Sequence, residues 1–271
     1  MIALVTGASS GIGAATARLL AREHGAELIV VARREQRLRE LVRDLDGGDR
    51  HTVVAVDLTS PAAPATVAAA VDQAGGRLDL LVNNAGAAWR GRFGESGYEN
   101  VRRHMELNFE AVLRLTEALL PALRAAAPSA IVNVGSTAGK VTRGNSGAYS
   151  ASKFALGAWS DALYLEEKPS GVHVGIVLPG FAATEGFPQR ELVDNARTRW
   201  IVSTPEKVAA AIVKTATERK AEVFVPSPYR AAAILRAIAP GLVRRALSGG
   251  GSAITPATGS NEVQIQPRQT E

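Results

Sequence analysis

The stretch Thr6-Gly7-Ala8-Ser9-Ser10-Gly11-Ile12-Gly13 decides the fold of this chain. It follows the apolar run 2–6, which predicts a strand, and it leads into residues 11–23, which predict a helix. Its glycines allow a tight turn and let the backbone come close to a pyrophosphate, while the helix start offers free N–H groups. A glycine-rich turn in this setting predicts a dinucleotide phosphate site formed by Gly7, Ser9, Ser10, Gly11, Ile12 and Gly13.

Strand and helix patterns alternate through the residues that follow. Further strands are expected over 27–32, 52–56, 78–82, 130–135, 172–178 and 222–225. Further helices are expected over 35–45, 62–74, about 96–124, 148–167 and 204–217. Ser60-Pro61 precedes the helix over 62–74, and a capping box from Ser96 to Glu99 opens the helix over about 96–124. Several strands are apolar throughout, which indicates that both of their faces are covered. The pattern predicts an α/β fold: a Rossmann-type, doubly wound, parallel seven-stranded sheet with helices on both faces.

Most of the net positive charge lies near the C-terminus. The 271 residues include 31 Lys and Arg against 26 Asp and Glu, a net charge of +5. Residues 230–247 hold four arginines and no acid among apolar residues. We expect a catalytic domain over 1–229, an amphipathic basic helical extension over 230–247 and a disordered tail over 248–271. The extension could pack on a substrate lid or a dimer partner, lie on an anionic membrane surface as a peripheral contact, or form a solvated arm.

Several function classes are excluded or disfavoured by residue content. The chain has no cysteine, which excludes disulfides, cysteine-ligated metals and thiol nucleophiles. Its four histidines are scattered, so we predict no metal site. Aromatic residues make up only 5% of the chain, and the body is nearly neutral, so we predict no nucleic-acid partner. Without a signal sequence or a long apolar run, a cytoplasmic protein is expected.

Two arginines stand where a cofactor-selecting acid is often found. Dinucleotide folds that use NAD commonly carry a carboxylate about 20 residues after the glycine loop, where it binds the ribose 2′-OH. This chain has Arg33 and Arg34 there. Guanidinium groups bind a 2′-phosphate that a carboxylate would repel, so the sequence favours NADP(H). The alternative is a solvated basic helix start, because more arginines follow.

A candidate catalytic group lies in the helix expected over 148–167. Tyr149 and Lys153 are four residues apart, so they share one face of that helix. An ammonium beside a phenol favours the phenolate and lowers its pKa, which suits acid–base work near neutral pH. Ser136 follows the end of an expected strand, from where its hydroxyl could bind a substrate oxygen.

These residues and others resemble the short-chain dehydrogenase/reductase family, in the branch that carries Tyr-x-x-x-Lys. The resemblance covers about residues 2–226 and rests on an ordered set: Thr6-Gly7-x-x-x-Gly11-x-Gly13, Asp57-Leu58, Asn83-Asn84-Ala85-Gly86, Asn108, Ser136, Tyr149-x-x-x-Lys153 and Pro179-Gly180-x-x-x-Thr184. It implies hydride transfer between NADP(H) and a ketone, an aldehyde or the matching alcohol.

The resemblance implies a role for each catalytic residue. Tyr149 would be the general acid that protonates the carbonyl oxygen, and Ser136 would orient that oxygen. Lys153 would lower the pKa of Tyr149 and hold the nicotinamide ribose. Asn108 would support a water chain that relays protons to Lys153.

The same resemblance implies further cofactor contacts. Asp57 and Leu58 would lie at the adenine, and Asn84, Ala85 and Gly86 would line the cofactor. Pro179, Gly180 and Thr184 would face the carboxamide, and Tyr149 and Lys153 would also touch the cofactor. As an alternative, Asn84 and Asn108 could be structural amides, Asp57 could cap a turn, and Thr184 could be an ordinary loop residue.

The substrate and the assembly are less well defined by sequence. A substrate loop is expected between Thr184 and Thr204, and an apolar pocket could include Trp89, Phe93, Phe181, Phe187 and Trp200. This predicts an apolar small-molecule carbonyl or alcohol, with plain core packing as the alternative. Related enzymes often end soon after the last strand, so the longer C-terminus puts their tetramer in doubt and leaves a homodimer or a higher oligomer open. It also argues against a 3-oxoacyl-carrier-protein reductase. A non-catalytic NADP(H) sensor or scaffold is the other alternative.

Overall fold

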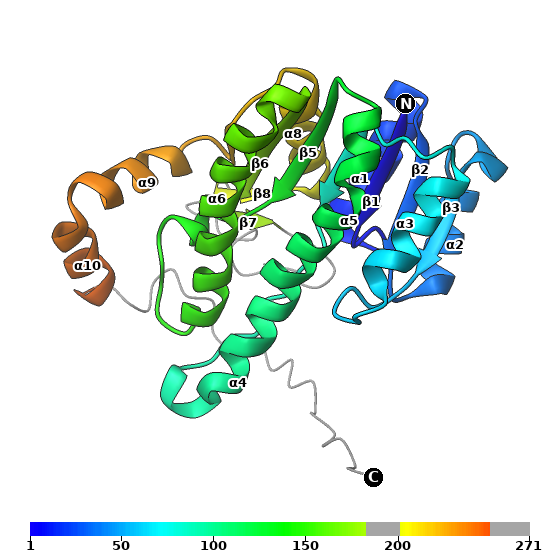
Figure 1. Ribbon diagram of the computed structural model, residues 1–271. Helices are drawn as coiled ribbons and strands as arrows, with labels where there is room; N and C mark the ends of the chain where they lie inside the picture. Colours follow the sequence, from blue (N-terminus) through cyan, green and yellow to red (C-terminus); the bar gives the residue numbers. More distant parts are fainter. Residues whose placement is uncertain (183–200, 250–271) are drawn as a thin grey trace, which may run out of the picture.

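The computed structural model describes residues 1–182 and 201–249. A parallel seven-stranded sheet runs through its centre in the order β3-β2-β1-β4-β5-β6-β9 (Figure 1). The strands are β1 (Ile2–Thr6), β2 (Glu27–Ala32), β3 (Thr52–Ala55), β4 (Leu80–Asn83), β5 (Ser129–Val134), β6 (Val172–Pro179) and β9 (Glu222–Val225). The order reverses between β1 and β4, which places the carboxyl ends of these strands at a topological switch point. The predicted fold class is confirmed.

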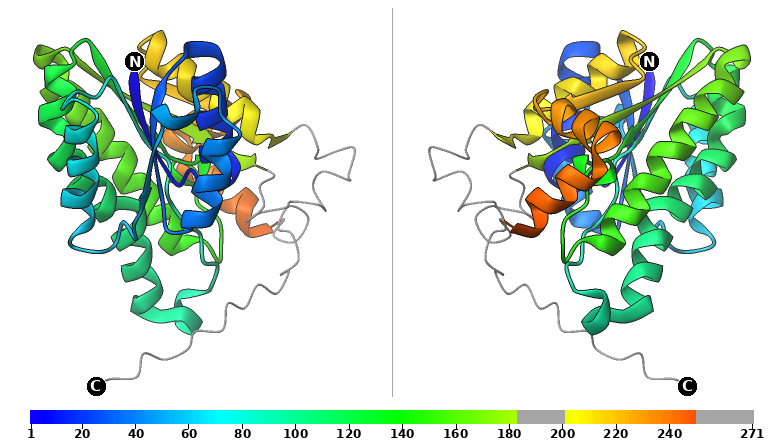
Figure 2. Two further views of the ribbon diagram at one scale, coloured as in Figure 1. Left: turned by 90° about the vertical axis from the view of Figure 1, so that its right-hand side faces the viewer. Right: turned by 90° about the vertical axis from the view of Figure 1, so that its left-hand side faces the viewer.

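Helices cover both faces of the sheet, as two views at right angles show (Figure 2). One face packs against α1 (Gly11–His24), α2 (Glu35–Arg43) and α8 (Pro205–Thr217), and the other against α3 (Ala63–Gln73), α5 (Ala111–Ala125) and α6 (Gly147–Glu167). Successive strand residues point to opposite faces, so Val5 enters the first core and Leu4 the second. The uninterrupted apolar strands of the sequence thus fill two cores at once.

The long helix expected over about 96–124 is three segments. Helix α4 (Phe93–Met105) begins earlier than expected, a π-helical turn spans Glu106–Glu110, and α5 continues from Ala111. Gly97 interrupts α4 with φ 59° and ψ −167°, a backbone conformation that a glycine adopts without a side-chain clash. The expected capping box does not form, because the Ser96 hydroxyl donates to the carbonyl of Arg92.

Other boundaries shift by a few residues. Helix α3 begins at Ala63 rather than directly after Ser60-Pro61, because residues 57–63 first form two turns, with Ser60 N–H bound to the Asp57 carbonyl and Ala63 N–H bound to that of Ser60. Strand β4 begins at Leu80, two residues later than expected. A separate two-stranded sheet pairs β7 (Phe181–Ala182) with β8 (Val202–Ser203), which the sequence did not indicate.

Two helices follow the last strand, and Figure 1 shows them extending away from the body of the protein. They are α9 (Tyr229–Ile238) and α10 (Pro240–Gly249). Ala239 separates the two helices, because Pro240 after it lacks the N–H that a continuing helix would need. The expected tail falls almost wholly on residues 250–271, outside the described part. Within residues 1–182 and 201–249, no helix is long and apolar enough to cross a membrane.

Candidate active site

The glycine loop between β1 and α1 leaves no room for side chains at its centre. Gly7 and Gly11 have positive φ angles of 67° and 55°. A β-carbon on Gly13 would lie 2.4 Å from the Gly7 carbonyl oxygen, so only glycine fits there. Ser10 is the N-cap of α1, yet its side chain caps no N–H group of the helix. The loop is a backbone cradle that opens at a helix N-terminus, which fits a pyrophosphate.

Thr6 and Asn84 join the ends of β1 and β4. The Thr6 hydroxyl accepts hydrogen bonds of 2.9 Å from the N–H groups of both Asn84 and Ala85. The Asn84 amide donates to the Thr6 carbonyl at 2.8 Å. A β-carbon on Gly7 would lie 2.8 Å from the same amide nitrogen. The side chain of Asn84 therefore packs against the glycine loop and holds it in place. This agrees with the alternative that Asn84 is a structural amide.

Arg34 lies over the glycine loop. Its guanidinium donates to the Ser10 hydroxyl at 2.8 Å and to the Ser9 hydroxyl at 3.2 Å and 3.3 Å. Arg33 approaches Asp57 to 4.0 Å, and both side chains are well exposed. The carboxyl ends of β1, β2 and β3 thus bring together two guanidinium groups and two serine hydroxyls, all of which can bind a phosphate.

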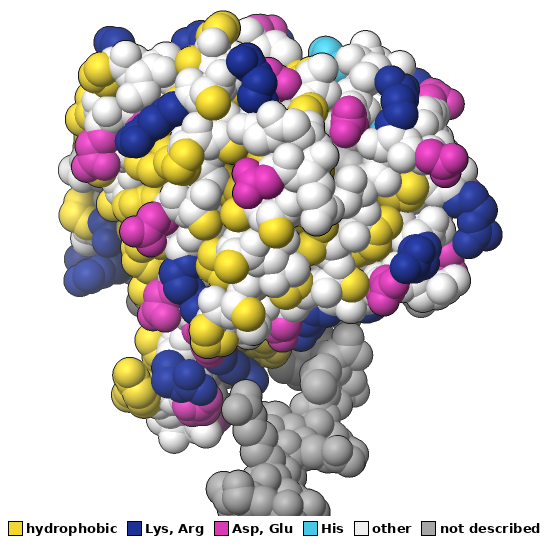
Figure 3. Space-filling view, turned by 45° about the vertical axis from the view of Figure 1, so that its right-hand side comes forward, with side chains coloured by type: hydrophobic (Ala, Val, Ile, Leu, Met, Phe, Trp, Pro, Cys, Tyr) yellow, Lys and Arg dark blue, Asp and Glu magenta, His cyan; other side chains and the backbone are white. Residues whose placement is uncertain are grey.

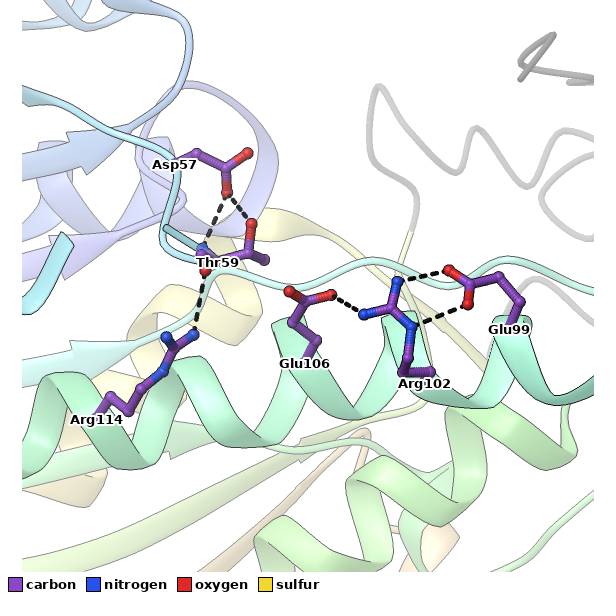
Figure 4. A network of polar contacts seen from close by, with 6 residues as sticks. All are labelled: Asp57, Thr59, Glu99, Arg102, Glu106 and Arg114. Atoms are coloured by element: carbon purple, nitrogen blue, oxygen red, sulfur yellow. Dashed lines mark hydrogen bonds and ion pairs between the residues drawn. The ribbon is translucent and has the colours of Figure 1, made fainter. Parts of the chain in front are cut away.

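Asp57 holds the loop that follows β3, as Figure 4 shows. One carboxylate oxygen accepts from the N–H group of Thr59 at 3.0 Å and from its hydroxyl at 2.8 Å. Arg114 of α5 donates to the Thr59 carbonyl at 3.3 Å. Burial, which raises the pKa of Asp57, is outweighed by the Thr59 hydrogen bonds and the charge of Arg33, so this pKa lies below its usual value. Asp57 caps a turn, as its alternative interpretation proposed, and Leu58 packs against the nearby core.

Ser136, Tyr149 and Lys153 lie near the carboxyl end of β5. Ser136 is buried; its hydroxyl accepts from the N–H group of Ala138 at 3.1 Å and reaches the Pro179 carbonyl at 3.5 Å. Lys153 is buried in α6, and its ammonium donates to the carbonyl of Val134 at 2.8 Å. The Ser136 hydroxyl also lies within hydrogen-bonding reach of Tyr149. One short region therefore contains a phenol, a hydroxyl and an ammonium.

The pKa values of this group differ from the expectation based on spacing. Burial raises the pKa of Tyr149, and the hydrogen bond with Ser136 opposes this only in part. Burial lowers the pKa of Lys153 to about 8. The predicted lowering of the Tyr149 pKa is therefore not found: burial dominates at Tyr149, and the Lys153 ammonium binds the Val134 carbonyl.

Asn108 lies in the π-helical turn and is fully buried. Its side chain binds both backbone groups of Ala87, accepting from N–H and donating to C=O at 2.9 Å each, and it also donates to the Ser152 hydroxyl at 3.1 Å. A β-carbon on Gly86 would lie 2.9 Å from Asn108 Oδ1 and 3.6 Å from Lys153 Nζ. The amide therefore has a structural task, but it also lies close to Lys153.

The carboxamide segment is partly described. Pro179 ends β6, and Gly180 N–H donates to the Val225 carbonyl at 2.9 Å. Phe181 is buried, with the Arg143 guanidinium 4.4 Å from its ring centre. Phe93 is exposed, at the start of α4. Thr184, Phe187 and Trp200, with most of the expected substrate loop, lie outside the described residues.

Two residues near this site escaped the sequence analysis. His104 accepts from the N–H group of Trp89 at 3.0 Å and stacks edge-on against Trp89 and Tyr149, with ring centres 4.9 Å and 6.1 Å away. The ring of Tyr229 packs against Gly180. His104 lies four residues before Asn108, and this spacing could have pointed to it. Nothing local in the sequence links Tyr229 to Gly180. Among the described residues, no group of three His, Cys, Asp or Glu could hold a metal ion.

This arrangement is that of a nicotinamide-dependent oxidoreductase, and comparisons with known proteins agree. A family model described as short chain dehydrogenase matches residues 1–192. The chain is 32% identical to dehydrogenase/reductase SDR family member 7B of Mus musculus, covering 91% of this chain and 80% of that one. It is 31% identical to the ketoacyl reductase HetN of a Nostoc strain, covering 82% and 77%.

A solved structure shows the same fold. The Pseudomonas aeruginosa RhlG/NADP active-site complex has a TM-score of 0.74 and 29% identity, covering 83% of this chain and 94% of that one. The chain therefore belongs to the short-chain dehydrogenase family and is an oxidoreductase of that family.

Proposed function

We propose that the protein interconverts a ketone or aldehyde and the corresponding alcohol with NADP(H) as the cofactor. The observation that carries the cofactor choice is the contact of Arg34 with Ser9 and Ser10, beside Arg33. A 2′-phosphate in this region would contact two guanidinium groups. The nearby carboxylate of Asp57 already accepts hydrogen bonds from Thr59. The solved relative with 29% identity is an NADP complex by its title.

The proposed mechanism assigns one task to each residue. Gly7, Gly11, Gly13 and the first turn of α1 would hold the pyrophosphate of the cofactor, whose nicotinamide would supply or accept the hydride. During reduction the Tyr149 hydroxyl gives its proton to the carbonyl oxygen, which the Ser136 hydroxyl orients. Because the pKa of Lys153 is about 8, its ammonium remains charged at neutral pH, and we assign it to binding the hydroxyl groups of the nicotinamide ribose. Asn108 keeps Ala87 and the adjoining Gly86 in place beside that ammonium.

The substrate is proposed to be a largely apolar carbonyl compound. Trp89, partly exposed in the segment that follows β4, offers apolar surface, whereas Phe181 is buried beneath Arg143. Because the Nostoc relative is a ketoacyl reductase by name, 3-oxoacyl thioesters belong in a substrate panel beside free ketones and aldehydes. The long C-terminus remains the argument against a carrier-bound substrate.

Cofactor titration tests the proposal directly. NADPH and NADH are titrated separately while nicotinamide fluorescence is followed, with the wild type and with Arg33→Ala and Arg34→Ala. The expected result is tight NADPH binding by the wild type, and a loss in the variants that is at least tenfold larger for NADPH than for NADH, since each guanidinium–phosphate contact is charge-assisted. Arg39→Ala is the matched control, because Arg39 pairs with Glu35 on the exposed face of α2.

Two results would contradict the proposal. Equal losses for both cofactors would make Arg33 and Arg34 surface charges and favour NAD(H). Tight NADPH binding without turnover of any carbonyl in the panel would favour the sensor or scaffold alternative.

A further inference from the structure

Helices α9 and α10, here called the C-terminal arm (residues 229–249), expose a set of large apolar side chains. These residues are 42–76% exposed: Ile234, Leu235, Ile238, Leu242 and Leu247. None of the α9 residues is buried, and in α10 Val243 is the buried residue among those described. Most other large apolar side chains of the described chain lie in its cores. The arm is therefore a concentrated exposed apolar surface.

The apolar side of α9 faces away from the protein body. Tyr229 and Ala233 pack against the core residues Ile176, Leu178 and Phe224, so they mark the inward side of the helix. At about 100° per residue, Ile234, Leu235 and Ile238 lie on the opposite side. Figure 1 shows the helix leaving the body of the protein, with α10 at its far end. The body of this chain therefore leaves that side uncovered within the described part.

The charge of the arm has a single sign. It carries Arg230, Arg236, Arg244 and Arg245, and no Asp or Glu occurs from residue 223 to residue 261. None of these arginines forms an ion pair with a described carboxylate, whereas those on α1, α2, α4 and α5 include several that do. On the face of the protein that Figure 3 shows, by contrast, basic and acidic side chains are interspersed. The arm thus combines arginines that have no acidic partner among the described residues with outward apolar side chains.

We propose that the C-terminal arm binds the surface of an anionic lipid bilayer. Apolar side chains of an interfacial helix enter the boundary between headgroups and acyl chains, while arginines contact the anionic headgroups. A second copy of the chain is the weaker partner, because two facing arms would bring eight arginines together with no acid from either arm. The proposal does not depend on the proposed reductase activity.

Vesicle flotation tests the proposal with the full chain. Vesicles of phosphatidylcholine alone are compared with vesicles that also contain phosphatidylglycerol, at low and high salt. The wild type is expected to float with the anionic vesicles, to stay behind with the neutral ones and to be released by salt, because screening weakens the headgroup contacts. Failure to float with anionic vesicles at low salt overturns the proposal.

Variants separate the two components of the surface. Ile234→Glu combined with Ile238→Glu should lower binding at least tenfold, because acids replace the inserted apolar side chains and repel the headgroups. Arg244→Gln combined with Arg245→Gln should weaken binding and reduce its dependence on salt. The matched controls are Leu165→Glu, at a 69% exposed leucine on α6, and Arg22→Gln with Arg39→Gln on α1 and α2. Controls that lose as much binding as the arm variants overturn the proposal.

Two further measurements keep these results interpretable. The far-UV circular dichroism spectrum and the cofactor affinity of each variant are compared with those of the wild type, which identifies a variant that does not fold. The single change Ile238→Glu, at the most exposed of these positions, then replaces the double variant. Analytical ultracentrifugation identifies the competing partner. If Ile238→Glu halves the molar mass and the wild type ignores vesicles, the arm is an interface between copies and the proposal is wrong.

Discussion

The ring of Tyr229 lies directly against the backbone of Gly180. A β-carbon placed on Gly180 would come 2.1 Å from Cε2 and 2.6 Å from Cζ of that ring. The Tyr229 hydroxyl also donates to the Ile201 carbonyl at 3.2 Å. The first residue of the C-terminal arm therefore packs against the segment that follows β6, beside the candidate site.

Gly180→Ala is expected to destabilise the protein by about 1–3 kcal/mol, the usual cost of overpacking. Urea unfolding measures the free energy, and cofactor titration measures the effect on the site. Adding Tyr229→Ala to Gly180→Ala should recover part of the loss, because the side chain that clashes is gone. If the two changes are simply additive, the contact does not restrict residue 180.

Tyr149→Phe is expected to lower the turnover of carbonyl reduction by about 10²–10⁴, because the ring remains but the transferable proton is lost. NADPH affinity should change little, which separates the proton from cofactor binding. The control is Tyr98→Phe, at an exposed tyrosine on α4. Undiminished turnover by Tyr149→Phe would remove this residue from the mechanism.

The buried ammonium of Lys153 is expected to make stability depend on pH. Burial lowers its pKa from 10.5 to about 8, so between these values the unfolded chain binds a proton that the folded chain does not. Stability should therefore rise with pH across this window, by about 2 kcal/mol between about pH 8 and about pH 9.5. Urea unfolding of the cofactor-free protein measures this. Lys153→Met should lack the rise; an equal rise in that variant would assign it to other groups.

The pair between Arg124 of α5 and Glu167 of α6 is expected to stabilise the helical layer. Arg124 Nε donates to Glu167 Oε2 at 2.9 Å, and the Glu167 side chain is 4% exposed. Arg124→Met should cost about 1–3 kcal/mol, because it removes charged hydrogen bonds from a buried carboxylate. Arg22→Met, at an exposed pair, should cost less than about 0.5 kcal/mol.

The same pair gives a pH dependence of known sign. The hydrogen bond and charge of Arg124 hold the pKa of Glu167 below its usual 4.5. Its stabilising effect is therefore present above about pH 4.5 and is lost as the pH falls through the lowered value. The difference in stability between the wild type and Arg124→Met should shrink on acidification. A difference that is constant with pH would mean that packing, and not charge, carries the effect.

Local sequence was sufficient for the elements that a strong local pattern specifies. The apolar strands Leu28–Ala32 and Val174–Leu178 indicated a sheet covered on both sides, and the glycine loop between a strand and a helix indicated a phosphate site. The prediction of a single long helix was wrong. The pattern of apolar residues continues through Gly97 and the π-helical turn, so it does not reveal the breaks in the helix. Tertiary contacts decide there: the π-helical turn brings the Asn108 amide to Ala87.

The sequence alone determined the parallel sheet, the family and the identity of the candidate site residues, because these depend on period, order and residue type. Only the tertiary structure decided how those side chains are used. Lys153 binds Val134, Asn84 braces Thr6 and Arg34 reaches Ser10, and each contact joins residues 19 to 78 positions apart. Hydrogen-bond partners and burial at such separations depend on how strands and helices pack, which no local pattern encodes.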